Sequence, residues 1–350
     1  MKRTVLAALL AGVMTLSLAA CGGTSSGGGG TAGGCNAGGG SNAGGGNAGG
    51  GSGGGYRISM VLKTNSSEFW QLVQAGAEAY AAEHPDLVAE LSIKGPPSES
   101  SYEDQLNMVQ TDIANASFDG YLIAPLQSEA VAAQIAGTDK PVIAFDTRIE
   151  SDKVVSFVGT GNEEAAKQGA IAAVEAAKAA GWTDIKCIEI AGVQGDATNT
   201  ARMNGFRAGV NENGGEFLDN EVQYANAVAD QAVTCMEAVM SKFPDGVAII
   251  CSNNDDMAIA AARTARNNPA FANTIFLGFD GQISACQTVL DGDLTMTAAQ
   301  NNFDIGYKAV ETMVQYLQGE SIDEFVDTGT EIITADNAQA RIDRMSGYLK

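Results

Sequence analysis

Residues 56–82 read YRISMVLKTNSSEFWQLVQAGAEAYAA, in which an apolar run at 57–62 precedes an amphipathic stretch at 68–82. The run has the length and composition of a buried strand, and the stretch after it repeats apolar residues at helical spacing. When a strand followed by a helix recurs along a chain, the pattern predicts parallel sheets covered by helices on both faces. The sequence therefore predicts an α/β fold.

The same alternation continues beyond this unit toward the C-terminus. Strands are predicted at 57–62, 88–93, 120–124 and 141–145, with helices at 68–82, 102–113 and 128–136. After a break at 154–162, strands are predicted at 185–191, 216–223, 247–251, 274–277 and 294–298, with helices at 163–180, 200–213, 228–242, 255–267 and 282–290. About ten strands would overfill one open sheet. Two Rossmann-like lobes are therefore expected, with a ligand cleft between the carboxyl ends of their strands.

The charge balance restricts the partners that this chain can bind. Its 350 residues include 42 acidic and 20 basic ones, a formal net charge of −22. A nucleic-acid backbone requires clustered Lys and Arg, so no nucleic-acid partner is expected. His84 is the only histidine, which removes most His-dependent catalysis and His-ligated metal sites. We expect neither a cofactor nor a metal.

The first 55 residues have the pattern of an export signal and a tether. Lys2 and Arg3 precede an apolar run at 5–20 that is too short and too rich in Ala and Gly for a membrane span, which is typical of a signal peptide at 1–20. Leu18-Ala19-Ala20-Cys21 resembles the bacterial lipobox, which implies lipidation of Cys21 and anchoring to the outer face of the cell membrane. A soluble secreted protein is the alternative. Residues 21–55 are Gly-rich and cannot build a core, so they are expected to form a tether.

Six cysteines stand at 21, 35, 187, 235, 251 and 286, without a C-x-x-C motif or a metal-ligand spacing. Cys187 and Cys251 lie in strand-like runs and Cys235 and Cys286 in helical ones, which is typical of buried free thiols. An exported protein could pair some of them in disulfides. The sequence leaves that pairing, and the role of Cys35, open.

Polar and aromatic residues follow the predicted strands at the ends where a ligand would bind. In the N-terminal half they are Lys63, Thr64, Asn65, Phe69, Trp70, Asp146, Thr147 and Arg148. In the C-terminal half they are Gly195, Asp196, Arg202, Asn253, Asn254, Asp255, Asp256, Phe279, Asp280 and Gln300. Singly, each has a structural explanation, since Asn254 suits a helix N-cap and Trp70 suits a core. Their joint position at strand ends favours a binding site.

This mixture of side chains fits a neutral polyol or sugar. Each hydroxyl donates one hydrogen bond and accepts through two lone pairs, so carboxylates and cationic or amide N–H groups serve it together. An anionic ligand would need an excess of cations, whereas Lys63 and Arg202 are accompanied by Asp146 and Asp280. No nucleophile stands with a base and an orienting residue, so no enzyme activity is expected. An exported enzyme that uses Asp146 and Asp280 for acid–base work is the alternative.

Seven motifs in a fixed order carry a resemblance to a known family. They are Val61-Leu62-Lys63-Thr64 with Glu68-Phe69-Trp70, Phe118-Asp119-Gly120 with Ala124-Pro125-Leu126, Pro141-Val142-Ile143-Ala144-Phe145-Asp146, Ala201-Arg202-Met203-Asn204-Gly205-Phe206, Asn254-Asp255-Asp256-Met257-Ala258, Gly278-Phe279-Asp280-Gly281, and Thr297-Ala298-Ala299-Gln300 with Asp304-Ile305-Gly306. Over 58–335 the chain resembles the sugar-binding substrate-binding proteins of bacterial ABC transporters, in particular their ribose-binding and allose-binding branch (periplasmic binding protein type I).

The resemblance implies a monomeric receptor that captures a monosaccharide or related polyol and delivers it to an ABC permease, with a lipid anchor as its only membrane contact. A receptor that reports its ligand to a sensor kinase or chemoreceptor is the alternative. Repressors that share this fold would need a DNA-binding segment in place of the export signal.

The same resemblance assigns contact residues and lobes. Ligand contacts are implied for Lys63, Phe69, Trp70, Asp146, Arg202, Asn254, Asp280 and Gln300, with Arg148, Asn226 and Phe279 as further candidates. Three chain crossings imply a hinge between an N-terminal lobe, 56–160 with 301–329, and a C-terminal lobe, 161–300 with 330–350.

Two departures from the family pattern bear on the ligand. Residues 224–227 read Tyr-Ala-Asn-Ala where the ribose and allose binders place a second aromatic residue. Thr147 follows Asp146 where ribose binders have an arginine, and Arg148 comes one place later. Both departures argue against ribose itself and favour another monosaccharide, a larger sugar or a non-sugar polyol.

Overall fold

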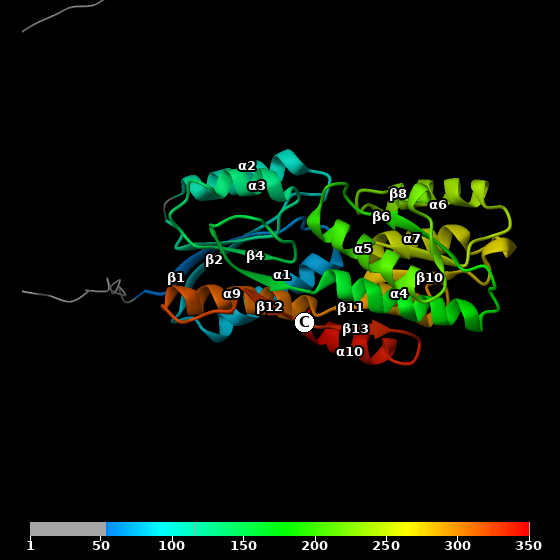
Figure 1. Cartoon of the computed structure of the whole chain (residues 1–350). Helices are drawn as coiled ribbons and strands as arrows, with labels where there is room; N and C mark the ends of the chain where they lie inside the picture. Colours follow the sequence, from blue (N-terminus) through cyan, green and yellow to red (C-terminus); the bar gives the residue numbers. More distant parts are fainter. Residues whose placement is uncertain (1–53, 116, 350) are drawn as a thin grey trace, which may run out of the picture. The chain divides into compact units, whose positions relative to one another are not determined.

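Two sheets organise the part of the chain that the structure, a computed structural model, describes: residues 54–115 and 117–349. The predicted signal peptide, Cys21, Cys35 and nearly all of the tether lie outside the described residues. Within these residues, strands and helices alternate along the chain, and each sheet forms the centre of one lobe (Figure 1). The predicted α/β class with two lobes is confirmed.

The N-terminal lobe is built on a six-stranded sheet in which every pair is parallel, in the order β12-β5-β4-β3-β1-β2. Its strands are β1 (Tyr56–Val61), β2 (Val88–Lys94), β3 (Gly120–Ile123), β4 (Val142–Phe145), β5 (Val154–Gly159) and β12 (Phe325–Asp327). Its helices are α1 (Glu68–Glu83), α2 (Tyr102–Ala114), α3 (Ser128–Ile135) and α9 (Asn302–Leu317). Side chains alternate along β1, so Ile58 and Met60 pack with α1 and α9, while Val61 joins the core beneath α2 and α3.

The C-terminal lobe is built on a second sheet, in the order β13-β11-β10-β9-β6-β7, with β8 also paired to β6. Its strands are β6 (Lys186–Ala191), β7 (Glu216–Phe217), β8 (Gln223–Tyr224), β9 (Ile249–Ser252), β10 (Ile275–Asp280), β11 (Met296–Gln300) and β13 (Thr330–Ile333). Its helices are α4 (Asn162–Ala179), α5 (Ala197–Glu212), α6 (Ala229–Lys242), α7 (Asp255–Ala265), α8 (Ile283–Leu290) and α10 (Ala338–Tyr348), with short 3₁₀ turns η1 (Asp219–Glu221) and η2 (Pro269–Phe271). Helices α4 and α5 cover the face that holds Cys187, and α6, α7 and α8 cover the face that holds Ile188.

Three sequence predictions for this lobe need correction. The strand predicted at 216–223 is two short strands, because the polar residues of η1 turn the chain between them. The predicted sheet is not entirely parallel, since β13 runs antiparallel to β11 at the edge of the sheet. Cys187, Cys251 and Cys286 are buried free thiols, but Cys235 is only partly buried. The Sγ atoms of Cys187 and Cys251 lie 3.4 Å apart on neighbouring strands.

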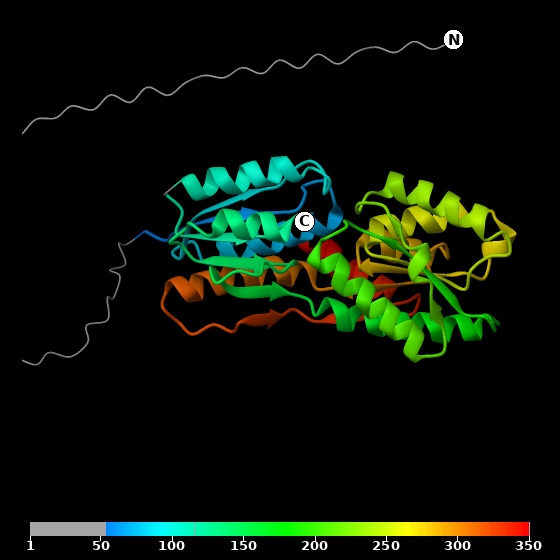
Figure 2. The same ribbon diagram turned by 45° about the horizontal axis from the view of Figure 1, so that its top comes forward.

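The chain passes between the two sheets three times, from β5 to α4, from β11 to α9 and from β12 to β13. Figure 2 shows the consequence: the orange helix α9 lies in the N-terminal lobe although it follows a strand of the C-terminal lobe. Thr328 N donates to Gly159 O at 2.9 Å, and Asn301 Nδ2 donates to Thr328 O at 2.5 Å. These bonds join the three crossings side by side.

Arg341 of α10 stabilises the second crossing, from β11 to α9, through hydrogen bonds. Its guanidinium is 1% exposed and donates to the carbonyl oxygens of Gly281 and Gln300. It also donates to Asn302 Oδ1 at 2.7 Å. A buried arginine with carbonyl and amide acceptors holds the backbone at the point where β11 leaves its sheet.

Among residues 54–115 and 117–349, no helix combines the length and the apolar content that a membrane crossing requires.

Candidate ligand-binding site

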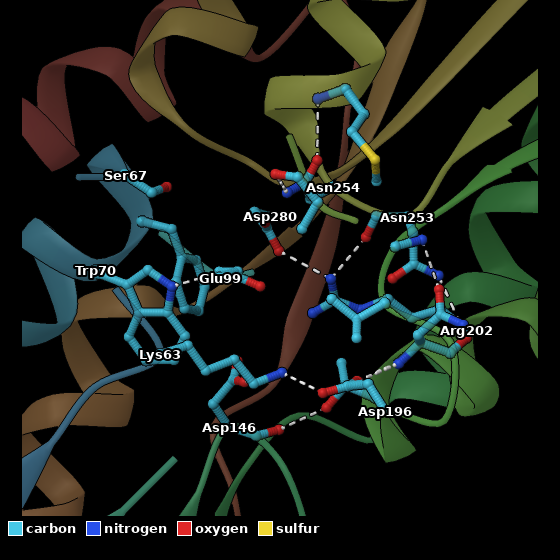
Figure 3. Close-up of a pocket in the computed structure, with 17 residues that line it drawn as sticks. Lys63, Ser67, Trp70, Glu99, Asp146, Asp196, Arg202, Asn253, Asn254 and Asp280 are labelled. Carbon is cyan, nitrogen blue, oxygen red and sulfur yellow. Dashed lines mark hydrogen bonds and ion pairs between the residues drawn. The ribbon is translucent and has the colours of Figure 1, made fainter. Parts of the chain in front are cut away.

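A pocket lies between the lobes, at the carboxyl ends of strands from both sheets (Figure 3). Seventeen residues line it: Lys63, Ser67, Phe69, Trp70, Glu99, Asp146, Gly192, Val193, Asp196, Thr198, Asn199, Arg202, Ala227, Asn253, Asn254, Met257 and Asp280. The space between its lining atoms is about 450 Å³, including the part that is open to solvent. The lining is largely polar and comes from both lobes.

Lys63 is the cationic centre of the N-terminal side. It follows β1, and its Nζ lies 2.6 Å from Asp196 Oδ2 and 3.8 Å from Asp146 Oδ2. Burial by itself would lower the pKa of Lys63, but the carboxylates of Asp196 and Asp146 outweigh it and the pKa is raised. Lys63 therefore stays charged. Because Asp196 belongs to the other lobe, this ion pair crosses the cleft.

Local backbone geometry places these two carboxylates. Asp196 is the N-cap of α5, where its Oδ1 accepts from Asn199 N at 2.7 Å. Asp146 directly follows β4 with φ 60°, a left-handed conformation that is uncommon outside glycine. Its Oδ2 accepts from Thr147 Oγ1 at 2.8 Å, and Thr147 Oγ1 lies 2.6 Å from Thr198 Oγ1 in the other lobe.

Arg202 of α5 is the cationic centre of the C-terminal side. Its Nε donates to Asn162 Oδ1 at 2.8 Å, and one terminal nitrogen, Nη1, donates to Asn253 O at 2.7 Å. The same nitrogen lies 3.3 Å from Asp280 Oδ1. The guanidinium stacks 3.8 Å from the ring centre of Phe279, and its other terminal nitrogen points into the pocket (Figure 3). Arg202 is thus held rigidly with one donor facing the space for a ligand.

Asp280 stands at the end of β10 with φ 116° and is 5% exposed. Its Oδ1 accepts from Gln300 Nε2 at 2.8 Å. Burial, joined by the neighbouring carboxylates of Asp146 and Asp256, raises its pKa to about 7 in spite of Arg202. Asp280 therefore changes its charge near neutral pH.

A second buried acid lies beneath the pocket floor. Glu189 of β6 accepts from Asn253 Nδ2 at 3.1 Å and so fixes the side chain of Asn253. Burial raises the pKa of Glu189 to about 8.

The aromatic wall comes from the start of α1. Phe69 and Trp70 meet edge to face with ring centres 4.9 Å apart, and Trp70 Nε1 donates to Glu99 Oε1 at 3.0 Å. Burial raises the pKa of Glu99, while Lys63 and Trp70 oppose the rise. The sequence prediction missed Glu99, although it lies beyond the end of the second predicted strand, in the same position as the strand-end residues that were selected.

The structure brings together most of the predicted contact residues. Lys63, Phe69, Trp70, Asp146, Arg202, Asn254 and Asp280 line the pocket. Gln300 and Phe279 stand behind it, where Gln300 supports Asp280 and Phe279 lies beneath Arg202. Asp196 and Asn253 line the pocket but were absent from the selected contacts, and Ser67, Gly192, Val193, Thr198, Asn199, Ala227 and Met257 were also missed as contacts.

The other two further candidates, like Phe279, lie outside the pocket lining. The exposed guanidinium of Arg148 stacks on Phe157 and Phe325 of the N-terminal lobe, 4.3 and 4.9 Å from their ring centres. Asn226 Nδ2 donates to Gln231 Oε1 at 2.9 Å, and Ala227, the next residue, faces the pocket instead.

Two α/β lobes that close over a polar cleft define the class of hinged solute-binding proteins. The "Periplasmic binding protein domain" family matches residues 58–321, and the chain belongs to this family. It is 29% identical to the D-allose-binding periplasmic protein of Escherichia coli over 266 residues, which cover 73% of this chain and 83% of that protein. It is also 29% identical to the ribose import binding protein RbsB of Escherichia coli over 269 residues, 76% of this chain and 86% of that protein.

Solved structures show the same architecture. An ABC transporter solute-binding protein from Mycobacterium smegmatis with bound glycerol is 28% identical and superposes with a TM-score of 0.71 over 82% of this chain and 96% of that one. An ABC transporter solute-binding protein from Agrobacterium vitis with bound D-fucose is 26% identical, with a TM-score of 0.72 over 80% of this chain and 96% of that one. The predicted resemblance is confirmed.

Proposed function

We propose that this protein captures a neutral monosaccharide or related polyol between its lobes and delivers it to the permease of an ABC transporter. The observation that carries the proposal is the lining of the pocket: cations paired with carboxylates, contributed by both lobes, beside the ring of Trp70. Such pairs donate to and accept from the same hydroxyl groups. The relatives named for allose and ribose, and the neighbours with bound D-fucose and glycerol, support this ligand class.

Capture follows from the division of the site between lobes. We take the lobes as 56–160 with 301–329 and 161–300 with 330–350, turning about the three crossings. A ligand held by Lys63 from one lobe and Arg202 from the other gains both contacts only when the cleft is shut. Binding therefore shifts the population toward the closed form, which is the form presented to the permease.

The lining also supports a ligand other than ribose. Among the described residues that line the pocket, the aromatic ones, Phe69 and Trp70, both come from the N-terminal lobe. On the opposite side Ala227 faces the pocket, in the stretch where the ribose and allose binders carry a second aromatic residue. A sugar ring would be stacked on one face only, and the other face is left to polar contacts.

The anchor belongs to the same proposal. Residues 1–20 would direct export, Cys21 would carry the lipid, and 21–55 would tether a monomeric receptor to the outer face of the membrane. Incorporation of radiolabelled palmitate into the wild type and its absence from Cys21→Ala test this assignment.

A thermal-shift screen of the fragment 51–350, which contains both lobes, tests the ligand class. Pentoses, hexoses, disaccharides, inositols and amino acids are compared. We expect a sugar or polyol to raise the midpoint by about 5 °C at about 100 times its Kd, because a ligand that binds only the folded form stabilises it.

Variants locate the site in the same screen. Asp146→Ala and Arg202→Ala should abolish the response, whereas Arg148→Ala, whose side chain lies outside the pocket lining, should keep it. A response to amino acids alone, or to none of these compounds, would overturn the sugar assignment.

A further inference from the structure

Glu68 forms a contact between the lobes that lies outside the pocket lining. It is the first residue of α1, in the N-terminal lobe. Its Oε1 accepts from the backbone N–H of Ile283, and its Oε2 accepts from Ser284 N at 3.2 Å. Both donors belong to the first turn of α8, in the C-terminal lobe. One carboxylate therefore bridges the two lobes through two hydrogen bonds.

The start of α8 lacks the cap that a helix normally supplies for itself. Its N-cap residue, Gln282, makes no side-chain hydrogen bond to the first turn. The first N–H groups of a helix have no partner within the helix, and the positive end of the helix dipole attracts an anion. The carboxylate of Glu68 accepts from these N–H groups and places a negative charge at the helix start, but only while the lobes are together. Opening the cleft would return these N–H groups to water.

We propose that Glu68 is a latch: it stabilises the closed arrangement of the lobes and thereby sets the affinity for every ligand without touching any of them. The apparent Kd of a hinged receptor is its intrinsic Kd divided by the fraction of closed, binding-competent molecules. A residue that changes this fraction alone changes the affinity for all ligands by one common factor. A substitution at a residue that contacts the ligand instead changes the affinity by a different factor for each sugar.

The first test needs no ligand. The sequence holds two tryptophans, Trp70 in the pocket and Trp182 elsewhere, so the full chain with Trp182→Phe reports on Trp70 alone. Trp70 is 2% exposed. We expect Glu68→Ala to increase quenching of Trp70 by acrylamide. The matched control is Glu78→Ala on the same helix, whose carboxylate accepts from Gln74 within α1, and this variant should not change the quenching.

The second test measures affinity. Removing a helix cap changes an equilibrium by about 2- to 30-fold, here the equilibrium between open and closed lobes. Glu68→Ala should therefore raise the Kd of each sugar that binds by one common factor in that range. Glu68→Gln, which keeps one acceptor, should fall between Ala and the wild type.

A variant of the partner tests whether Glu68 acts through α8. Ile283→Pro removes one donor at the first helical position, where proline is favoured, and Gln282 already has the extended backbone, φ −63° and ψ 155°, that precedes proline. Its effect should resemble that of Glu68→Ala. The double variant should be little worse than either single one, because both remove the same interaction.

A rise in quenching, or a common loss of affinity, with Glu78→Ala unchanged, supports the latch. Absence of both effects overturns it, and so does a loss that differs from sugar to sugar, because Glu68 would then contact the ligand. The affinity test rests on the proposed function, whereas the quenching test does not. If the wild type binds no sugar, the proposed function fails and quenching alone decides the latch.

Discussion

At the scale of single residues, the cleft holds more carboxylates than cations. Glu99, Asp146, Asp196 and Asp280 line it together with Lys63 and Arg202. Lys63 is shared between Asp196 and Asp146, and Arg202 pairs with Asp280. Burial nevertheless raises the pKa of Asp280 to about 7, so the charge of this carboxylate changes near neutral pH.

Sugar affinity should therefore rise as the pH increases through about 7 and then level off. Under the proposed function a sugar hydroxyl would donate to the ionised carboxylate of Asp280, so the ligand would bind the ionised form more tightly and release a proton on binding. Below that pH the protonated acid has lost one acceptor. Asp280→Asn should bind more weakly and show no pH dependence near 7, as measured by calorimetry. An identical pH profile in both proteins would show that Asp280 is not the acceptor.

At the scale of elements, glycines allow two pairs of helices to approach closely. A Cβ atom at Gly76 of α1 would overlap the carbonyl oxygen of Phe303, at α9, and one at Gly306 of α9 would overlap Val73 O of α1. Gly205 of α5 faces the carbonyl of Glu163 in α4 in the same way. Backbone lies against backbone at these points, so the neighbour cannot give way by rotating a side chain.

Gly76→Ala should destabilise the protein by about 2–4 kcal/mol, because the added methyl group forces α1 away from α9. Urea unfolding followed by circular dichroism measures the change. The control is Gly347→Ala in α10, where no atom lies within 4 Å of the added Cβ. This variant should lose no stability, since alanine has the higher helix propensity. Equal stability of the two variants would contradict the close approach of α1 and α9.

At the scale of the whole molecule, the acidic charge opposes compactness. Residues 56–350 keep all 42 acids and lose only Lys2 and Arg3 among the bases, so the formal charge of this part is −24. Like charges repel across the surface and destabilise the folded state. Salt shortens the range of that repulsion, from about 30 Å at 0.01 M ionic strength to about 10 Å at 0.1 M.

Raising the ionic strength over this range at pH 7 should therefore increase the midpoint of thermal unfolding, by about 2–4 °C for each kcal/mol of repulsion that is screened. Scanning calorimetry measures the midpoint. Near the pI of about 4.2 the net charge vanishes, and the dependence on salt should vanish with it. If the midpoint of thermal unfolding at pH 7 does not change with ionic strength, the acidic residues are spaced too widely to repel one another.

Much of the site could be predicted from the sequence, because apolar runs show where strands end and which residues follow them. Lys63 follows an apolar run, and Asp280 follows another, so their place at the ligand end of a sheet depends only on local periodicity. Arg148 could not be placed this way, because its guanidinium packs on Phe325, a residue of β12 that lies far away in the sequence. Asn226 also lies outside the pocket lining, where it binds Gln231, and the next residue, Ala227, faces the pocket.

The sequence by itself determined the α/β class, the two lobes and the polar strand ends, since each depends on hydrophobic periodicity and on residue type. Only the tertiary structure decided that Lys63 pairs with Asp196 and that Glu68 caps α8. These partners stand 133 and 216 positions apart. Their contact depends on how closely one lobe approaches the other, which is set by the three crossings and by packing over the whole molecule rather than by any local pattern.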